Sequence, residues 1–207
     1  MPKLIIDIEE TELKEMVKSI FSKIDYPLRF DIIRIGTSYK TAFLGGDLDN
    51  EMKIMINPGN KIIKNKRLFR GHLARFIFFL INKKEGLNRE IGENLEVRDL
   101  AKFTQNFFAD YKAVKYGFKK EMRDFYVEKI LKRIYDEREI SKGEYIEFYA
   151  SGLILKKVKE EAEVENLIEN INIPRLEPLL KELDRLNYPY FFGDSALKKA
   201  WLKTFYL

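Results

Sequence analysis

Residues 66–84 read KRLFRGHLARFIFFLINKK, and the fold of the chain is expected to depend on this stretch. Its apolar residues recur at intervals of three and four, which is the spacing of a helix with one face in a hydrophobic core. The residues with this spacing are Phe69, Leu73, Phe76, Ile77 and Leu80. Asn65 is a suitable N-cap, and Lys83 and Lys84 suit the last turn, where cations are favourable. The stretch therefore predicts a buried helix of about five turns.

The residues before this helix predict one further helix and a set of short strands. Residues 10–23 have the spacing of an amphipathic helix, for which Thr11 is a suitable cap. Short runs of apolar and β-branched residues predict an edge strand and three further strands, over residues 2–8, 29–35, 41–44 and 52–56. Residues 36–39 and the sequence GGDLDN at residues 45–50 predict turns between them.

The residues after the central helix predict helices only. A long helix is expected over residues 97–116, with Gly117 as the residue that ends it. Further apolar periodicities predict helices over residues 118–135, 143–161, 176–186 and 194–206. We therefore expect an α+β fold, with a small mixed sheet and its helices in residues 1–117. An all-helical extension, residues 118–207, is expected to pack on this core.

The composition limits the kinds of protein that this chain can be. Apolar residues make up 45% of the chain, which is enough for a hydrophobic core in one domain of ordinary size. There is no cysteine, which excludes disulfides, thiolate metal sites and cysteine nucleophiles. The first residues lack the apolar run of a signal peptide, and the longest apolar run, residues 76–81, is too short to span a bilayer. We therefore expect a cytoplasmic protein without a membrane partner.

The centre of the predicted helix has the outline of a metallopeptidase motif. Residues 71–75 read GHLAR. A zinc-binding helix of this outline reads His-Glu-Leu-Ala-His, in which two histidines one turn apart bind the metal and the glutamate is the general base. Gly71 and Arg75 stand at the two histidine positions, and His72 stands at the glutamate position. With this motif and the order of its predicted elements, the chain resembles the small zincin-type metallopeptidases over about residues 28–117.

The resemblance extends to the next predicted helix. The glutamate-zincin branch carries its third zinc ligand there, within Asn-Glu-x-x-x-Asp, and residues 105–110 of this chain read QNFFAD. Asn106 stands at the ligand position, and Asp110 matches the supporting aspartate. Because neither the ligands nor the base is retained, the resemblance implies a site without catalysis, zinc or another cofactor. It also implies that Arg75 and Asp110 face each other, so that an ion pair replaces the metal between two helices.

A second feature is a basic interval in the first half of the chain. No acidic residue occurs between Glu51 and Glu85, whereas nine lysines and arginines do. Such an interval is a candidate nucleic-acid contact. Its candidate residues are Lys53, Lys61, Lys64, Lys66, Arg67 and Arg70. An ordinary solvated surface around a buried helix accounts for these charges equally well.

Three functions remain open from the sequence. The first is a non-catalytic binding module with a protein or peptide partner, in which an extended peptide adds to the edge strand beside the former substrate cleft. The second is a nucleic-acid-binding protein that uses the basic interval. The third is an enzyme with altered chemistry at His72, Arg75 and Asp110. Basic side chains gathered on one face favour nucleic acid, whereas their burial favours the peptide cleft.

Overall fold

The computed structural model describes residues 2–24, 30–41, 43–48, 51–85 and 105–134, together with residues 26, 28, 182 and 199. The first residues of the helix predicted over 97–116 lie outside this part of the chain. So do almost all residues of the helices predicted beyond residue 134. The division at residues 117 and 118 into a core and a helical extension therefore stays a prediction.

The structure contains one mixed, four-stranded sheet, so the predicted α+β class is confirmed. Its strands are β1 (Lys3–Asp7), β2 (Ile32–Thr37), β3 (Leu44–Leu48) and β4 (Met52–Ile56), in the spatial order β1-β2-β4-β3. The first three strands in this order run parallel, whereas β3 pairs antiparallel with β4 and forms one edge. The strand predicted at the start of the chain is β1, and it forms the other edge.

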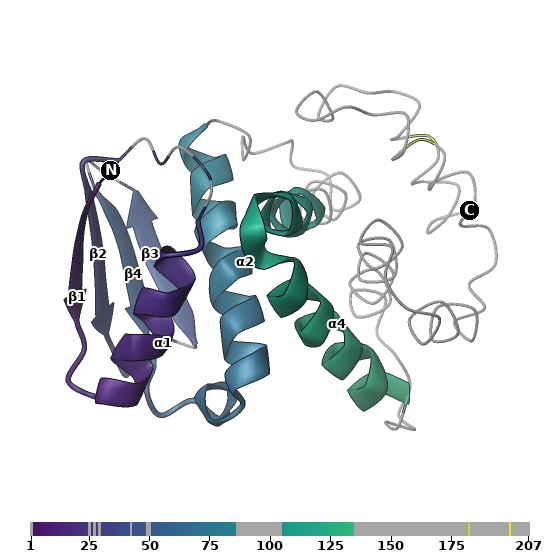
Figure 1. Cartoon of the computed structure of the whole chain (residues 1–207), viewed down its shortest axis with the longest axis horizontal. Helices are drawn as coiled ribbons and strands as arrows, with labels where there is room; N and C mark the ends of the chain where they lie inside the picture. The colour runs from purple at the N-terminus through teal and green to yellow at the C-terminus, as the bar shows by residue number, and fades with distance from the viewer. Residues whose placement is uncertain are drawn as a thin grey trace.

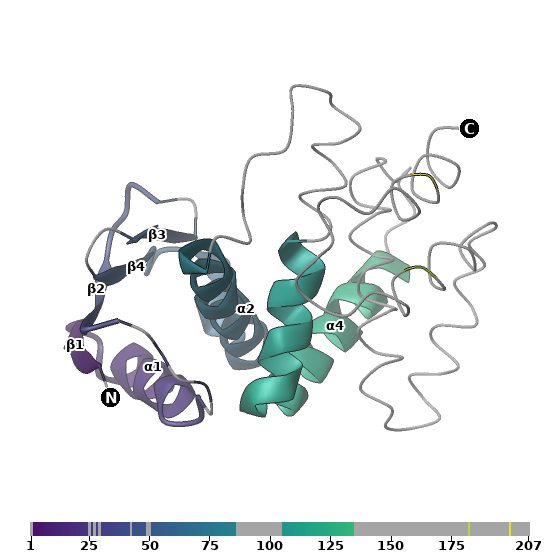
Figure 2. The same cartoon turned by 90° about the horizontal axis from the view of Figure 1, so that it is seen from above.

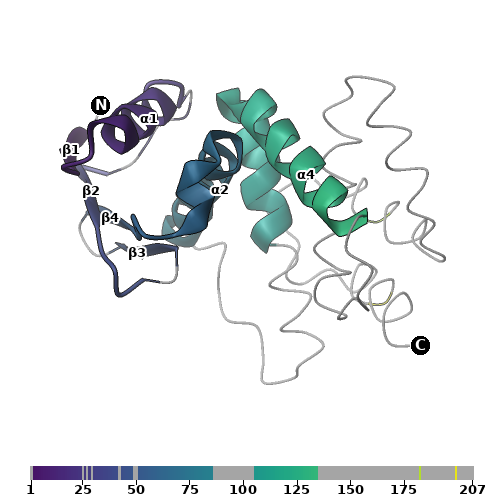
Figure 3. The same ribbon diagram turned by 90° about the horizontal axis from the view of Figure 1, so that it is seen from below.

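Two helices cover one face of this sheet. They are α1 (Thr11–Phe21), which connects β1 to β2, and α2 (Lys66–Lys84), which follows β4 (Figure 1). Seen from above, the sheet forms one layer, α1 and α2 a second, and α4 lies beyond α2 (Figure 2). The view from below shows the same order of layers (Figure 3). The buried residues of β4 alternate as a sheet with one covered face requires: Met52, Ile54 and Ile56.

The helix α2 agrees with its prediction from the sequence. It spans the predicted residues, and the Asn65 side chain caps it by accepting hydrogen bonds from the backbone N–H groups of Arg67 and Leu68. Four of the five predicted core residues are buried, and Phe76 is half-buried. The cap predicted for α1 is wrong, because Glu10 precedes that helix and Thr11 is its first residue. A short 3-10 helix, η1 (Lys61–Lys64), which the sequence did not indicate, precedes α2.

The strand boundaries differ from the prediction where glycines were interpreted as turns. Residues 45–48 belong to β3, and Gly36 lies within β2, opposite Met55. The reason at Gly46 is close packing: a Cβ there would lie 2.8 Å from the Lys53 carbonyl oxygen and about 3 Å from side-chain carbons of Phe76 and Leu80. Gly46 therefore lets α2 approach the sheet, and it does not reverse the chain.

A helical hairpin packs on the outer side of α2. Helical residues 105–113 continue into a π-helical turn, η2 (Val114–Phe118), and then into α4 (Lys119–Ile134). The direction changes at Gly117, whose φ of 103° lies in the left-handed region that favours glycine. The predicted helix end at this glycine is confirmed. Phe118, Met122, Phe125 and Tyr126 belong to the same buried cluster as the residues of α2. Among the described residues, no helix combines the length and the apolar character needed to cross a membrane.

Candidate functional site

The centre of α2 meets the helical hairpin at a buried polar cluster. The carboxylate of Asp110 is fully buried, and its Oδ1 lies 2.9 Å from Nε of Arg75, whose side chain is 17% exposed. The Tyr126 hydroxyl donates a hydrogen bond to Oδ2 of the same carboxylate. These three residues, which we call the Asp110 cluster, come from α2, from the helix over residues 105–113 and from α4. The predicted contact between Arg75 and Asp110 is thus confirmed.

The other former motif positions have packing roles. A Cβ on Gly71 would lie 2.4 Å from Cβ of Phe125 and 3.0 Å from the Glu121 carbonyl oxygen, so α4 can approach α2 only at a glycine. The half-buried His72 ring lies edge-on between the rings of Phe43 and Phe125, with centroid distances of 5.3 and 4.6 Å. His72 therefore joins the sheet side of α2 to α4.

The described residues near the former motif do not form a zinc site. Asn106, which stands at the third ligand position, is half-buried one turn before Asp110. No group of three or more His, Asp or Glu side chains gathers in the described part of the chain. In the Asp110 cluster, the partners of the carboxylate are a guanidinium and a phenol. Neither group is a ligand that zinc prefers. The arrangement can hold together the three helical segments that contribute its residues.

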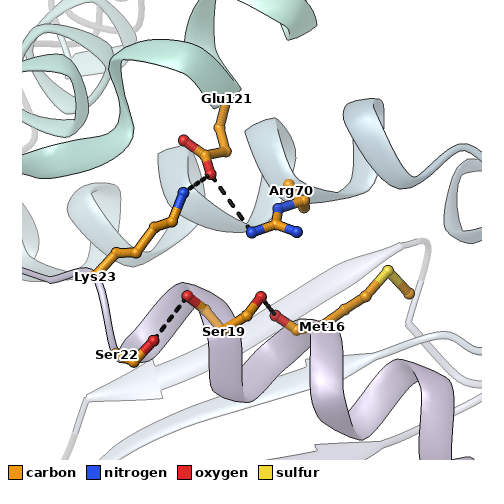
Figure 4. A network of polar contacts seen from close by, with 6 residues as sticks. All are labelled: Met16, Ser19, Ser22, Lys23, Arg70 and Glu121. Carbon is orange, nitrogen blue, oxygen red and sulfur yellow. Dashed lines mark hydrogen bonds and ion pairs between the residues drawn. The ribbon is translucent and has the colours of Figure 1, made fainter.

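Two further charged clusters link the hairpin to the rest of the fold. Glu121 is 5% exposed, and its Oε1 lies 2.5 Å from Nζ of Lys23 and 3.6 Å from the guanidinium of Arg70. Figure 4 shows these two cations reaching the carboxylate from α2 and from the segment after α1. Arg70 therefore faces the hairpin, and it does not join the other basic residues in an exposed surface.

The second cluster surrounds Lys112, whose side chain is 7% exposed. Its Nζ lies 2.6 Å from Oε2 of Glu85 and 4.3 Å from the centroid of the Tyr26 ring. Burial lowers the pKa of Lys112, and the hydrogen bond and charge of Glu85 oppose this shift. A pKa below the unfolded value means that the folded chain becomes more stable as pH rises toward 10.5.

Four of the six predicted nucleic-acid contacts gather at the N-terminal end of α2. They line an open pocket of about 530 Å³ together with Asn65 and Glu128, and we call this the cationic pocket: Lys61, Lys64, Lys66 and Arg67. Lys66 forms an ion pair of 2.5 Å with Glu12. Within the described residues, Lys61, Lys64 and Arg67 form none. Glu128, the acidic residue of the pocket, accepts a hydrogen bond from the Asn65 side chain.

The remaining two predicted contacts lie elsewhere. Lys53 is on β4, where it and Arg34 are each 3.4 Å from the carboxylate of Glu51. Arg70 pairs with Glu121, as described above. The six predicted contacts therefore divide into four that line one exposed pocket and two that form ion pairs elsewhere.

Comparisons with known proteins found no match for this chain. No protein-family model, no curated protein and no solved structure matches it. The site is therefore interpreted from its own geometry.

Two side chains were not singled out from the sequence, one in the Asp110 cluster and one outside the sites described above. Tyr126 completes the Asp110 cluster from α4, sixteen residues after Asp110. Tyr126 reaches Asp110 only because α4 packs beside the helix over residues 105–113, and no local sequence pattern predicts this contact. Tyr39 is 78% exposed in the turn after β2, and an exposed tyrosine cannot be told from a buried one by residue type alone.

Proposed function

We propose that this chain is a non-catalytic binding module with a zincin-like frame. The observation that carries the proposal is the ion pair between Arg75 and Asp110. These two residues stand at a ligand position and at the supporting position of the motif, and their contact joins two helices in the way that a shared metal would. A buried ion pair with a tyrosine as third member is suited to structural support.

Within the described residues, no strand pairs with the outer edge of β3, so the frame offers this edge to a peptide. Asn57 donates its backbone N–H to the Phe43 carbonyl oxygen, which sets the alternation of hydrogen-bonded pairs along β3 and β4. In this register, Leu44, Gly46 and Leu48 direct their main-chain N–H and C=O groups away from β4. An extended peptide can add to these groups as a fifth strand.

An apolar surface lies beside this edge. The rings of Phe76 and Phe79 on α2 are half-buried and stacked, with their centroids 6.4 Å apart. Phe76 also approaches Gly46 on β3. Alternate side chains of an added strand point toward the helix layer, so we expect a peptide with apolar residues at every second position.

One substitution tests the edge directly. Leu44→Pro removes an outward N–H group while the hydrogen bonds to β4 remain, and Leu44→Ala is the matched control that retains the N–H. Peptides selected from a display library against the parent protein should lose binding to Leu44→Pro and retain it on Leu44→Ala. Equal binding to both variants would exclude strand addition at β3.

The non-catalytic part of the proposal has its own test. Elemental analysis of the purified protein should find no stoichiometric zinc, because the motif retains too few donors for the three or four that zinc requires. One tightly held zinc per chain would contradict the proposal.

A second candidate function is favoured by the cationic pocket. Three cations that form no ion pair with another described residue surround an open pocket, which suits the phosphates of a nucleic acid. If this function holds, affinity should fall steeply with salt, since bound counterions are released.

The salt dependence can be assigned to the pocket with a matched pair of triple variants. Replacing Lys61, Lys64 and Arg67 by glutamine should reduce the slope of log affinity against log salt by about 2 for a single strand. A control changes the net charge equally at exposed lysines outside the pocket, by glutamine at Lys3, Lys83 and Lys120. Equal slopes for the two triple variants would exclude the pocket as the binding site.

A further inference from the structure

An exposed aromatic ring stands at the same end of the sheet as the cationic pocket. Tyr39 lies in the turn that follows β2, and residues 57–60 form the turn that follows β4 and leads into η1. Because β2 and β4 are parallel neighbours, their carboxyl ends meet at one edge of the sheet. This is the edge at which open α/β sheets commonly bind ligands.

The two turns lie close together, so the ring stands beside the segment that leads into the pocket. A Cβ placed on Gly59 would lie 3.6 Å from the nearest carbon of the Tyr39 ring. Gly59 precedes Lys61, the first pocket residue, by two positions. Tyr39 is 78% exposed, the largest exposure among the large apolar and aromatic side chains described as exposed. The exposed ring therefore lies beside the turn that leads to Lys61.

The attraction of the pocket for anions comes from its side chains. The N-terminus of α2 is already capped, because the Asn65 carboxamide accepts the hydrogen bonds of Arg67 and Leu68 N–H. Glu128 reduces the positive charge, and its contact with the Asn65 amide holds it at one wall. Lys61, Lys64 and Arg67 remain to neutralise phosphates.

From this juxtaposition we propose that the chain binds single-stranded nucleic acid, with the phosphates in the cationic pocket and an unpaired base stacked on Tyr39. The inference rests on the second candidate function above and specifies its ligand. A base can reach the ring only when it is unstacked, which favours a single strand over a duplex. Stacking on an aromatic side chain accepts any base, so no sequence preference is expected from this contact.

The experiment compares two fluorescein-labelled single strands of equal length at low salt. One is poly(dT), and the other is an abasic strand that carries the same phosphates without bases. The parent protein should bind poly(dT) more tightly. Tyr39→Ala should lower the affinity for poly(dT) by about 5- to 150-fold and leave the abasic strand unchanged. Tyr39→Phe should retain the parent affinity, because the ring face is preserved.

Each outcome has a defined meaning. Glutamine at Lys61, Lys64 and Arg67 should weaken binding of both strands. If the parent binds the two strands equally, or if Tyr39→Ala has no effect while the pocket variant does, base stacking is excluded and the phosphate pocket stands. If neither strand binds at low salt, the second candidate function fails together with this inference.

Discussion

Two arginines on α2 show how the same residue type serves different purposes at two places on one helix. Arg75, near the middle, is 17% exposed and lies 2.9 Å from the fully buried carboxylate of Asp110. Arg67, in the first turn, is exposed and forms no ion pair with another described residue. Loss of the Asp110 carboxylate leaves the Arg75 charge without compensation, whereas loss of the Arg67 charge leaves a hydrated surface. The middle of α2 should therefore affect stability, and its N-terminal end should affect binding.

The largest effect is expected at the Asp110 cluster. Asp110→Ala removes the carboxylate and leaves the Arg75 guanidinium and the Tyr126 hydroxyl without their acceptor. The free energy of unfolding should fall by about 3–5 kcal/mol, measured by urea denaturation. Glu85→Ala, which also removes a carboxylate from an ion pair but one that is 28% exposed, should cost less. A loss below about 1 kcal/mol at Asp110 would mean that the pair behaves as an exposed one.

An intermediate effect is expected where α4 crosses α2. Gly71→Ala places a methyl group 2.4 Å from Cβ of Phe125, so α4 must move. Overpacking of this kind costs about 1–3 kcal/mol, partly offset by the better helix propensity of alanine. Gly36→Ala is the control, because its Cβ would come no closer than 3.4 Å to a neighbour, and that neighbour is the flexible end of Met55. If Gly71→Ala stabilises the protein, the two helices are not in close contact there.

The smallest effect on stability is expected at the cationic pocket. Glutamine at Lys61, Lys64 and Arg67 removes three exposed charges that form no ion pair with another described residue. Such surface changes alter the free energy of unfolding by about 0.5 kcal/mol or less each. Thermal or urea denaturation should therefore leave the stability near that of the parent, while the salt slope of binding changes. A large loss of stability would place these cations in the structural group with Arg75.

The elements that the sequence predicted correctly are those governed by local signals. The bounds of α2 follow from its apolar periodicity and from Asn65, and the end of the next helix follows from Gly117, whose positive φ few other residues adopt. Local signals gave the wrong element where tertiary contacts determine the backbone conformation. Gly46 belongs to a glycine-rich sequence that is typical of a turn. It nevertheless lies in β3, where the side chains of Phe76 and Leu80 approach it closely.

The candidate site shows the same division. The contact between Arg75 and Asp110 could be predicted because the resemblance to the zincin motif assigns both residues to inward-facing positions of two neighbouring helices. Tyr126 could not, since its contact depends on how α4 returns across α2. The basic interval was visible in the sequence, but only the fold gathers Lys61, Lys64, Lys66 and Arg67 at one pocket and places Lys53 and Arg70 in ion pairs elsewhere.

The most direct test of the central claim is a double-mutant cycle on Arg75 and Asp110, measured as the free energy of unfolding. The four proteins are the parent, Arg75→Met, Asp110→Leu and the variant with both changes. If the two residues form one structural bridge, each single change should be strongly destabilising. The double change, with apolar side chains of similar volume, should then cost much less than either single change. Additive losses, with the double variant as unstable as the sum of the two single variants, would contradict the claim.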